Sequence, residues 1–194
     1  MTGPTIATDR QQTYALRRTV VLVGMMGSGK TAIGRAVSQT LDVPYVDSDA
    51  EIEAAANSTI AEIFEKSGES FFRDREAEIV ARLLQSDPCI LSTGGGAYLA
   101  PRNRAAISEH GVAVWLDADL DLLWDRVRHK DTRPLLRTPD PRATLAEIFE
   151  ARAPIYAKAD LRAVADPAFS IEQMTHEVLR VLATRPDILE TPPQ

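Results

Sequence analysis

The sequence contains little cysteine, few aromatic residues and no long apolar run. Its single cysteine, Cys89, cannot form an internal disulfide, and its apolar neighbours are typical of a core position in a reducing compartment. No segment approaches the roughly 18 apolar residues that a membrane-spanning helix needs. The 22 basic and 28 acidic residues leave a formal net charge of -6, which disfavours nucleic acid or an anionic membrane as the main partner. We therefore expect a cytoplasmic protein, and the net charge still allows a small anionic ligand, which needs only a local cluster of arginines.

The order of the apolar runs predicts one α/β domain. Short apolar runs alternate with longer segments of helical spacing, which is typical of a parallel sheet with helices on both faces. We expect a flexible arm over residues 1–17, the domain over 18–184 and a proline-rich tail over 185–194. Strands are expected at 19–24, 43–47, 89–92, within 111–118 and at 161–165. Helices are expected at 30–41, from 48 onward, and at 59–64, 71–84, 101–109, 120–129, 142–157 and 170–184.

A glycine-rich loop follows the first expected strand. The segment GMMGSGKT, Gly24 to Thr31, matches G-x-x-x-x-G-K-[ST] at every position and precedes an expected helix. In such a loop, backbone N–H groups face phosphate oxygens, Lys30 reaches the β- and γ-phosphates, and the Thr31 hydroxyl binds Mg²⁺. The chain contains no N-K-x-D motif for guanine, and its third expected strand does not end in a metal-binding aspartate. This combination favours a small-molecule kinase over a GTPase or a motor ATPase.

Two carboxylates follow the second expected strand. Asp47 and Asp49 come at its carboxyl end, which is where ligands bind in parallel α/β sheets. We interpret Asp47 as a partner of the metal's water shell, and Asp49 as the group that orients or deprotonates an attacking hydroxyl. Helix capping is the alternative interpretation, because Ser48 and Glu51 have the spacing of a capping box and acids favour a helix N-terminus.

Two further segments carry candidate residues whose role stays open. Gly94, Gly95 and Gly96 follow the third expected strand and indicate that something approaches bare backbone there. Arg73 and Glu76 are three residues apart on a helix, so they form either an exposed ion pair or a site for a substrate carboxylate.

The segment from about 128 to 141 breaks all helical periodicity. Its prolines Pro134, Pro139 and Pro141 forbid a regular helix, and Arg133 is one of its basic residues. The segment is interpreted either as a mobile lid that excludes water from a kinase site or as a solvated basic loop.

Taken together, these motifs resemble those of the shikimate kinases, small P-loop kinases of aromatic amino acid biosynthesis. The resemblance covers about residues 18–182 and rests on GMMGSGKTAIGR, DSDAEIE, IAEIFEKSGESFFRDRE, LSTGGGA, TRPLL and RAPIY, in this order. It implies a three-layer α/β/α P-loop kinase fold with a central five-stranded parallel sheet and a mobile lid. It also implies transfer of the γ-phosphoryl of ATP to the 3-hydroxyl of shikimate, with Mg²⁺ as cofactor.

The resemblance implies a role for each matching residue. The catalytic residues are Asp49 as general base, with Lys30 and Arg133 on the transferring phosphoryl group. The shikimate-binding residues are Asp49, Arg73, Gly95, Gly96 and Arg152, with Glu76 as the partner of Arg73. The ATP-binding residues are Gly27, Ser28, Gly29, Lys30, Thr31, Ala32, Arg126 and Arg133, where Arg126 stacks on adenine and a second adenine contact falls near Pro167. The metal residues are Thr31 and Asp47.

Two other functions fit part of the pattern. A gluconate-type kinase shares the phosphate loop, but the paired arginines and the triple glycine count against it. A regulator that binds nucleotide without turnover would be expected to lack Asp49, Arg133 or Lys30, and all three are present. For the active kinase we expect a monomer that binds ATP and shikimate and has no nucleic-acid or membrane partner.

Overall fold

The computed structural model describes residues 15–129 and 134–190, and its core is a five-stranded parallel sheet. The strand order is β3-β4-β2-β5-β6. The strands are β2 (Thr19–Val23), β3 (Tyr45–Asp47), β4 (Ile90–Ser92), β5 (Gly111–Asp117) and β6 (Leu161–Val164). All five lie within the apolar runs that predicted them. Every residue of the central β2 is buried, because helices cover both faces of the sheet.

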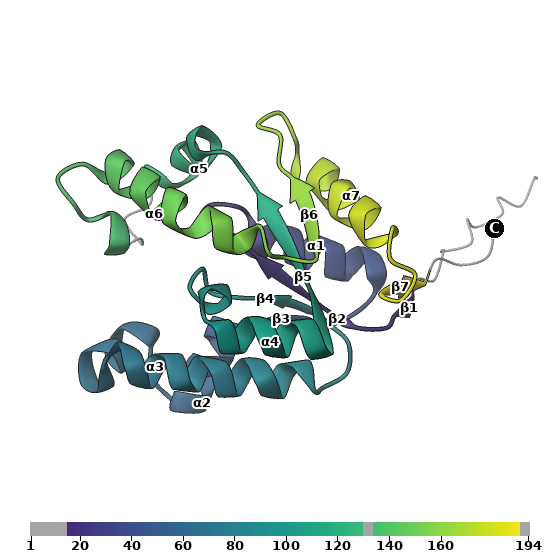
Figure 1. Ribbon diagram of the computed structural model, residues 1–194, viewed down its shortest axis with the longest axis horizontal. Coiled ribbons are helices and arrows are strands. Elements are labelled where there is room, and N and C mark those ends of the chain that lie inside the picture. Colours follow the sequence, from purple (N-terminus) through teal and green to yellow (C-terminus); the bar gives the residue numbers. More distant parts are fainter. Residues whose placement is uncertain (1–14, 130–133, 191–194) are drawn as a thin grey trace, which may run out of the picture.

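The helices form a layer on each side of the sheet (Figure 1). On one face α1 (Lys30–Leu41) packs with α7 (Ile171–Leu182), and on the other α4 (Pro101–His110) packs with α3 (Ile60–Leu84). The described residues also form α2 (Ser48–Ala56), α5 (Leu120–Val127), α6 (Pro141–Tyr156) and the 3-10 turns η1 (Ala97–Leu99) and η2 (Pro134–Leu136). The predicted three-layer α/β/α fold is confirmed. Within the described ranges, no helix has both the length and the apolar character needed to cross a bilayer.

Helix α3 consists of two helical stretches that meet at Gly68. Gly68 has φ 80° and ψ 173°, a conformation that essentially only glycine adopts. The sequence predicted two helices in this region, and the first begins with the expected capping box of Thr59 and Glu62. The second stretch buries Phe72 in the core and carries Arg73 on the next position.

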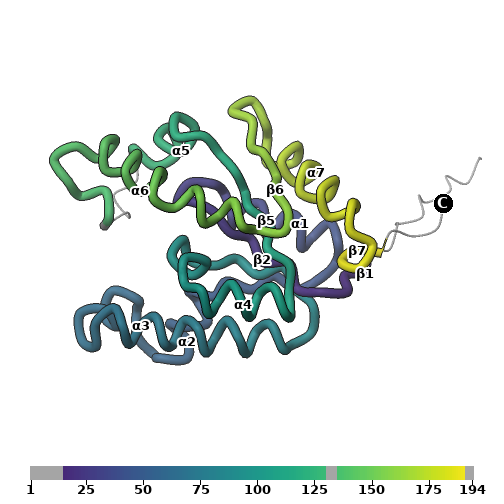
Figure 2. The backbone as a smooth tube through the Cα atoms, viewed as in Figure 1, coloured from purple at the N-terminus to yellow at the C-terminus, as the bar shows by residue number. Residues whose placement is uncertain are grey.

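A short antiparallel ribbon joins the two ends of the described chain. β1 (Ala15–Leu16) pairs with β7 (Leu189–Glu190), and the Arg17 N–H donates to the Ile188 carbonyl at 2.8 Å. Ile188 is fully buried, so the ribbon closes part of the core. Figure 2 shows it at the end of the molecule away from α5 and α6. The sequence had placed these residues in the expected arm and tail and predicted no strand in them.

Candidate active site

The loop between β2 and α1 has the backbone of a phosphate cradle. Gly24, Gly27 and Gly29 have φ of 141°, 84° and 96°, which L side chains rarely adopt. Helix α1 begins at Lys30, directly after Gly29, so its free N–H groups face the loop and favour an anion there. The Lys30 ammonium donates to the carbonyls of Gly24 and Met25 at 2.9 and 3.0 Å, and it therefore lies folded over the loop.

This loop lines a cavity of about 450 Å³ at the carboxyl edge of the sheet. Ser28 lies in the loop, and its hydroxyl is buried with no hydrogen-bond partner in the described part of the chain. A buried hydroxyl without a partner costs free energy, which a bound ligand can recover by supplying one. The backbone path and the Ser28 hydroxyl both fit a phosphate group.

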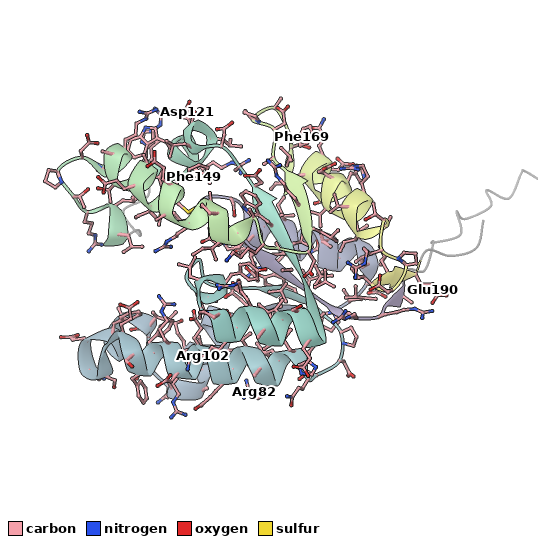
Figure 3. The ribbon with its side chains drawn as sticks, in the orientation of Figure 1. Arg82, Arg102, Asp121, Phe149, Phe169 and Glu190 are labelled. Carbon is pink, nitrogen blue, oxygen red and sulfur yellow. The ribbon has the colours of Figure 1, made fainter. Side chains whose placement is uncertain are left out.

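Helix α5 and the start of α7 also contribute residues to the lining of the cavity. The Arg126 guanidinium donates to the Gly27 carbonyl at 3.3 Å. Phe169, labelled in Figure 3, lies in the loop before α7, and Ile171 begins the helix. The sequence placed a second adenine contact near Pro167, which stays a prediction. Two residues after Pro167, Phe169 lines the cavity, and Ile171 lines it at the start of α7.

Asp47 and Asp49 reach the cavity from the end of β3. Asp47 is the N-cap of α2, and its carboxylate accepts the Asp49 N–H at 3.0 Å and the Tyr45 hydroxyl at 3.2 Å. The predicted capping box of Ser48 and Glu51 is wrong, because extended backbone continues through Asp47 and moves the cap one residue earlier. Asp47 therefore caps the helix and also presents a carboxylate to the cavity.

The pKa of the Asp49 carboxyl is raised to about 6. Burial is the main cause, the negative charges of Asp47 and Glu76 add to it, and the positive charge of Lys30 opposes it. Such a carboxyl is ionised at neutral pH but binds a proton more readily than an exposed aspartate. These are the properties of a general base.

Gly94 and Gly96 each lie against a charged side chain of the protein. A Cβ on Gly94 would come within 2.6 Å of the Asp49 carboxylate, and a Cβ on Gly96 within 2.6 Å of the Arg73 guanidinium. Neither glycine has a positive φ, so close approach rather than backbone conformation excludes a side chain. The sequence indicated that something approaches the bare backbone of the three glycines. At Gly94 and Gly96 a side chain of the protein does so, whereas Gly95 has no atom closer than 3.9 Å to its Cβ position.

Arg73 is held by two carboxylates of its own helix. Its guanidinium donates to both oxygens of Glu76, at 2.9 and 3.2 Å, and to Glu69 at 3.3 Å. Glu76 is only 1% exposed, so the exposed ion pair that helical spacing allowed is excluded. Burial raises the pKa of Glu76, and Arg73 opposes this shift. Charge-assisted bonds from Nη1 to Glu76 and from Nη2 and Nε to Glu69 fix the orientation of the arginine.

Helix α6 contributes two residues beside the loop of residues 94–96, which we call the glycine loop. The Arg152 guanidinium lies 3.9 Å from the Cβ position of Gly95, so Arg152 and Arg73 approach neighbouring residues of the loop. One helical turn later, the buried Tyr156 hydroxyl donates to the Gly95 carbonyl at 2.5 Å. Tyr156 belongs to the RAPIY motif, but its role was missed because a tyrosine on a helix is most simply a core residue.

The structure brings the predicted site residues to one edge of the sheet. Those that line the cavity are Gly27, Ser28, Gly29, Lys30, Thr31, Ala32, Asp47, Asp49, Gly95 and Arg126. Arg73, Gly96 and Arg152 lie beside the same glycine loop. Arg133 lies outside the described residues, and its role stays a prediction.

The donors at the cavity suit one kind of metal ion. Residues 15–129 and 134–190 contain no group of three or more His, Cys, Asp or Glu side chains that could hold a metal. The Thr31 hydroxyl and the Asp47 carboxylate do line the cavity. Such hard oxygen ligands, few in number, fit Mg²⁺, which keeps several waters and binds substrate phosphates.

The sequence also matches known proteins over most of its length. The family model for shikimate kinase matches residues 26–183. The chain is 66% identical over 176 residues to a shikimate kinase of Ruegeria pomeroyi, covering 91% of this chain and 90% of that protein. It is 61% identical over 182 residues to a shikimate kinase of Cereibacter sphaeroides, covering 94% and 91%.

Solved structures give the same grouping. The shikimate kinase of Acinetobacter baumannii in complex with shikimate has a TM-score of 0.80 at 32% identity, covering 86% of this chain and 93% of that one. A gluconokinase of Sinorhizobium meliloti has a TM-score of 0.57 at 16% identity, covering 87% and 93%, which shows a shared fold alone. Because the family model and close relatives span nearly the whole domain, the chain belongs to the shikimate kinase family.

Proposed function

We propose that this protein transfers the γ-phosphoryl of ATP to the 3-hydroxyl of shikimate, giving shikimate 3-phosphate and ADP in aromatic amino acid biosynthesis. One observation carries the proposal: a phosphate cradle, an aspartate with a raised pKa and two arginines meet at one glycine loop. Membership of the shikimate kinase family supports the ATP-dependent reaction. The shikimate-bound Acinetobacter baumannii relative supports the acceptor.

The nucleotide half of the site is the cradle and the lining residues from α5 and the start of α7. The β- and γ-phosphates bind the loop N–H groups and Lys30, and the Ser28 hydroxyl gains the partner that it lacks. When bound, Mg²⁺ would neutralise the β- and γ-phosphate oxygens, held by the Thr31 hydroxyl and, through water, by Asp47. Adenine lies against Arg126 and the apolar wall at α7.

Asp49 is the base in the proposed reaction. As the 3-hydroxyl oxygen forms its bond to the γ-phosphorus, the bond from that phosphorus to the ADP oxygen breaks and Asp49 accepts the hydroxyl proton. The contact with Gly94 restricts where the Asp49 carboxylate can lie. Lys30 and Arg133 offset the charge of the transferring group, the latter by resemblance to the family.

The arginines beside the glycine loop are proposed to bind the carboxylate of shikimate. Arginine presents a planar fork that matches a carboxylate. Arg73 is already oriented by Glu76, and Arg152 lies next to it along the loop. Two cations at one end of the acceptor site favour an anionic substrate over a neutral sugar.

The experiment that tests the function measures ADP release in a coupled assay. Purified protein with ATP and Mg²⁺ should release ADP only after shikimate is added, and ³¹P NMR should identify the 3-phosphate. Gluconate serves as the matched acceptor without the ring. ADP release without shikimate, or with gluconate in its place, contradicts the proposal, and shikimate binding without ADP release indicates a non-catalytic regulator.

The monomeric state and the cytoplasmic location also stay predictions. Light scattering behind size-exclusion chromatography tests the first, with a single species near the 21.3 kDa of one chain expected.

A further inference from the structure

Tyr156 links α6 to the glycine loop. Its side chain is 1% exposed, and its hydroxyl donates to the Gly95 carbonyl at 2.5 Å, although the two residues are 61 positions apart in sequence. Burial raises the pKa of this hydroxyl, with the charge of Arg152 opposing the shift. The hydroxyl therefore keeps its proton at neutral pH and acts as a donor.

The bond falls at the centre of the acceptor half of the site. Gly95 stands between Gly94, which contacts Asp49, and Gly96, which contacts Arg73. A shift of the Gly95 carbonyl therefore moves the backbone against which both side chains lie. Because Arg152 precedes Tyr156 by one turn of α6, the same bond also sets the distance between Arg152 and the loop.

We propose that Tyr156 is a positioning residue for the phosphate acceptor: through Gly95 it holds the loop where Asp49, Arg73 and Arg152 face one substrate. The inference rests on the proposed function, since shikimate is the acceptor. Tyr156 itself is not among the described residues that line the cavity, so it acts through Gly95 and not by touching a ligand. Such a role changes binding of the acceptor more than binding of ATP, whereas a general contribution to the core would affect both alike.

Steady-state kinetics of Tyr156→Phe distinguish a role in positioning the acceptor from a general contribution to the core. The hydroxyl donates to the Gly95 carbonyl and is also hydrogen-bonded to the Arg152 side chain. Its loss should raise the KM for shikimate about fivefold, while the KM for ATP changes by less than about twofold. Tyr98→Phe is the matched control, because Tyr98 is another buried tyrosine beside the loop, on η1, and its hydroxyl makes no hydrogen bond to the loop in the described residues. It should leave both KM values unchanged. Equal changes in the two KM values, or a lower melting temperature alone, would overturn the inference.

Hydrogen–deuterium exchange of the protein without ligands tests the same inference independently of turnover. In Tyr156→Phe, exchange over residues 94–99 should be faster by about threefold or more, while the phosphate loop and Tyr98→Phe exchange as the wild type does. Unchanged exchange over residues 94–99 contradicts the role of Tyr156, whatever the acceptor. Lack of shikimate-dependent ADP release by the wild type, in contrast, contradicts the proposed function while this exchange result still decides the role of Tyr156.

Discussion

At the scale of single residues, the main feature is the Asp49 carboxylate, whose charged form destabilises the folded protein. The pKa of Asp49 in the folded protein is about 6, above its ordinary value of 3.8, so the folded state binds the proton more tightly than the unfolded chain. The stability that Asp49 contributes is therefore fully present below about pH 4 and is lost as the pH rises through about 6. At neutral pH the charged form destabilises the fold.

Asp49→Asn should therefore be more stable than the wild type at neutral pH and inactive. Asparagine carries no charge at any pH. The free energy of unfolding of the variant at about pH 7.5 should therefore be about 1–2 kcal/mol higher than that of the wild type, and this difference should vanish near pH 4. Urea unfolding at the two pH values measures this difference. The ATP affinity of the variant should be nearly unchanged. In the wild type, kcat/KM should decrease as the pH is lowered through about 6, because Asp49 becomes protonated. Loss of ATP affinity in the variant would place Asp49 in the metal site.

An alanine at Gly96, an outer residue of the glycine loop, should weaken shikimate binding. Gly96 has φ −89° and ψ −20°, which alanine adopts without strain, so Gly96→Ala displaces the Arg73 guanidinium rather than the backbone. We expect the KM for shikimate to rise by about tenfold, because one carboxylate contact is lost, with little change in melting temperature.

Gly95→Ala is the control for this prediction. Its Cβ would meet no protein atom closer than 3.9 Å, so any increase in the KM for shikimate there reports contact with the ligand itself. An increase in the KM for ATP in Gly96→Ala would contradict the assignment of this loop to the acceptor.

At the scale of elements, local sequence signals placed most helices and strands, and tertiary contacts corrected their ends. The glycine-rich loop lies in the predicted position, because φ values that favour glycine are a local property of the chain. The cap of α2 was misplaced by one residue, since it depends on how far β3 continues its pairing with β4, through Asp47 and Ser92. The break in α3 was predicted as a gap between two helices, and the structure assigns it to Gly68.

At the scale of the whole molecule, the two ends of the described chain are joined by the β1–β7 ribbon. No pattern in the sequence predicted it, because each strand has two residues and the partners are far apart in the chain. The ribbon lies at the amino end of the sheet, away from the active site at the opposite edge. Its contribution is therefore expected to be to stability and not to catalysis.

Ile188→Ala tests this separation. Ile188 is 0% exposed, so truncation should lower the free energy of unfolding by about 2–4 kcal/mol, with the KM values unchanged at a temperature where the variant is folded. The matched control is Glu190→Ala, which removes only an exposed ion pair with Arg17 and should cost less than about 1 kcal/mol. Equal effects of the two substitutions would show that the ribbon closes no part of the core.

The sequence by itself determined the order of the elements and the position of the phosphate loop, because apolar periodicity and glycine conformation act over a few neighbouring residues. The arginines of the acceptor site were proposed from the resemblance to the shikimate kinase motifs, and their roles stay predictions. Only the tertiary structure decided which atoms lie against the glycines, which carboxylate is desolvated and which side chain holds Gly95. Each of these depends on contact between residues far apart in the chain, as between Asp49 and Gly94 or Tyr156 and Gly95. Burial, and with it the pKa of Asp49 and the environment of Glu76, exists only once those segments have packed together.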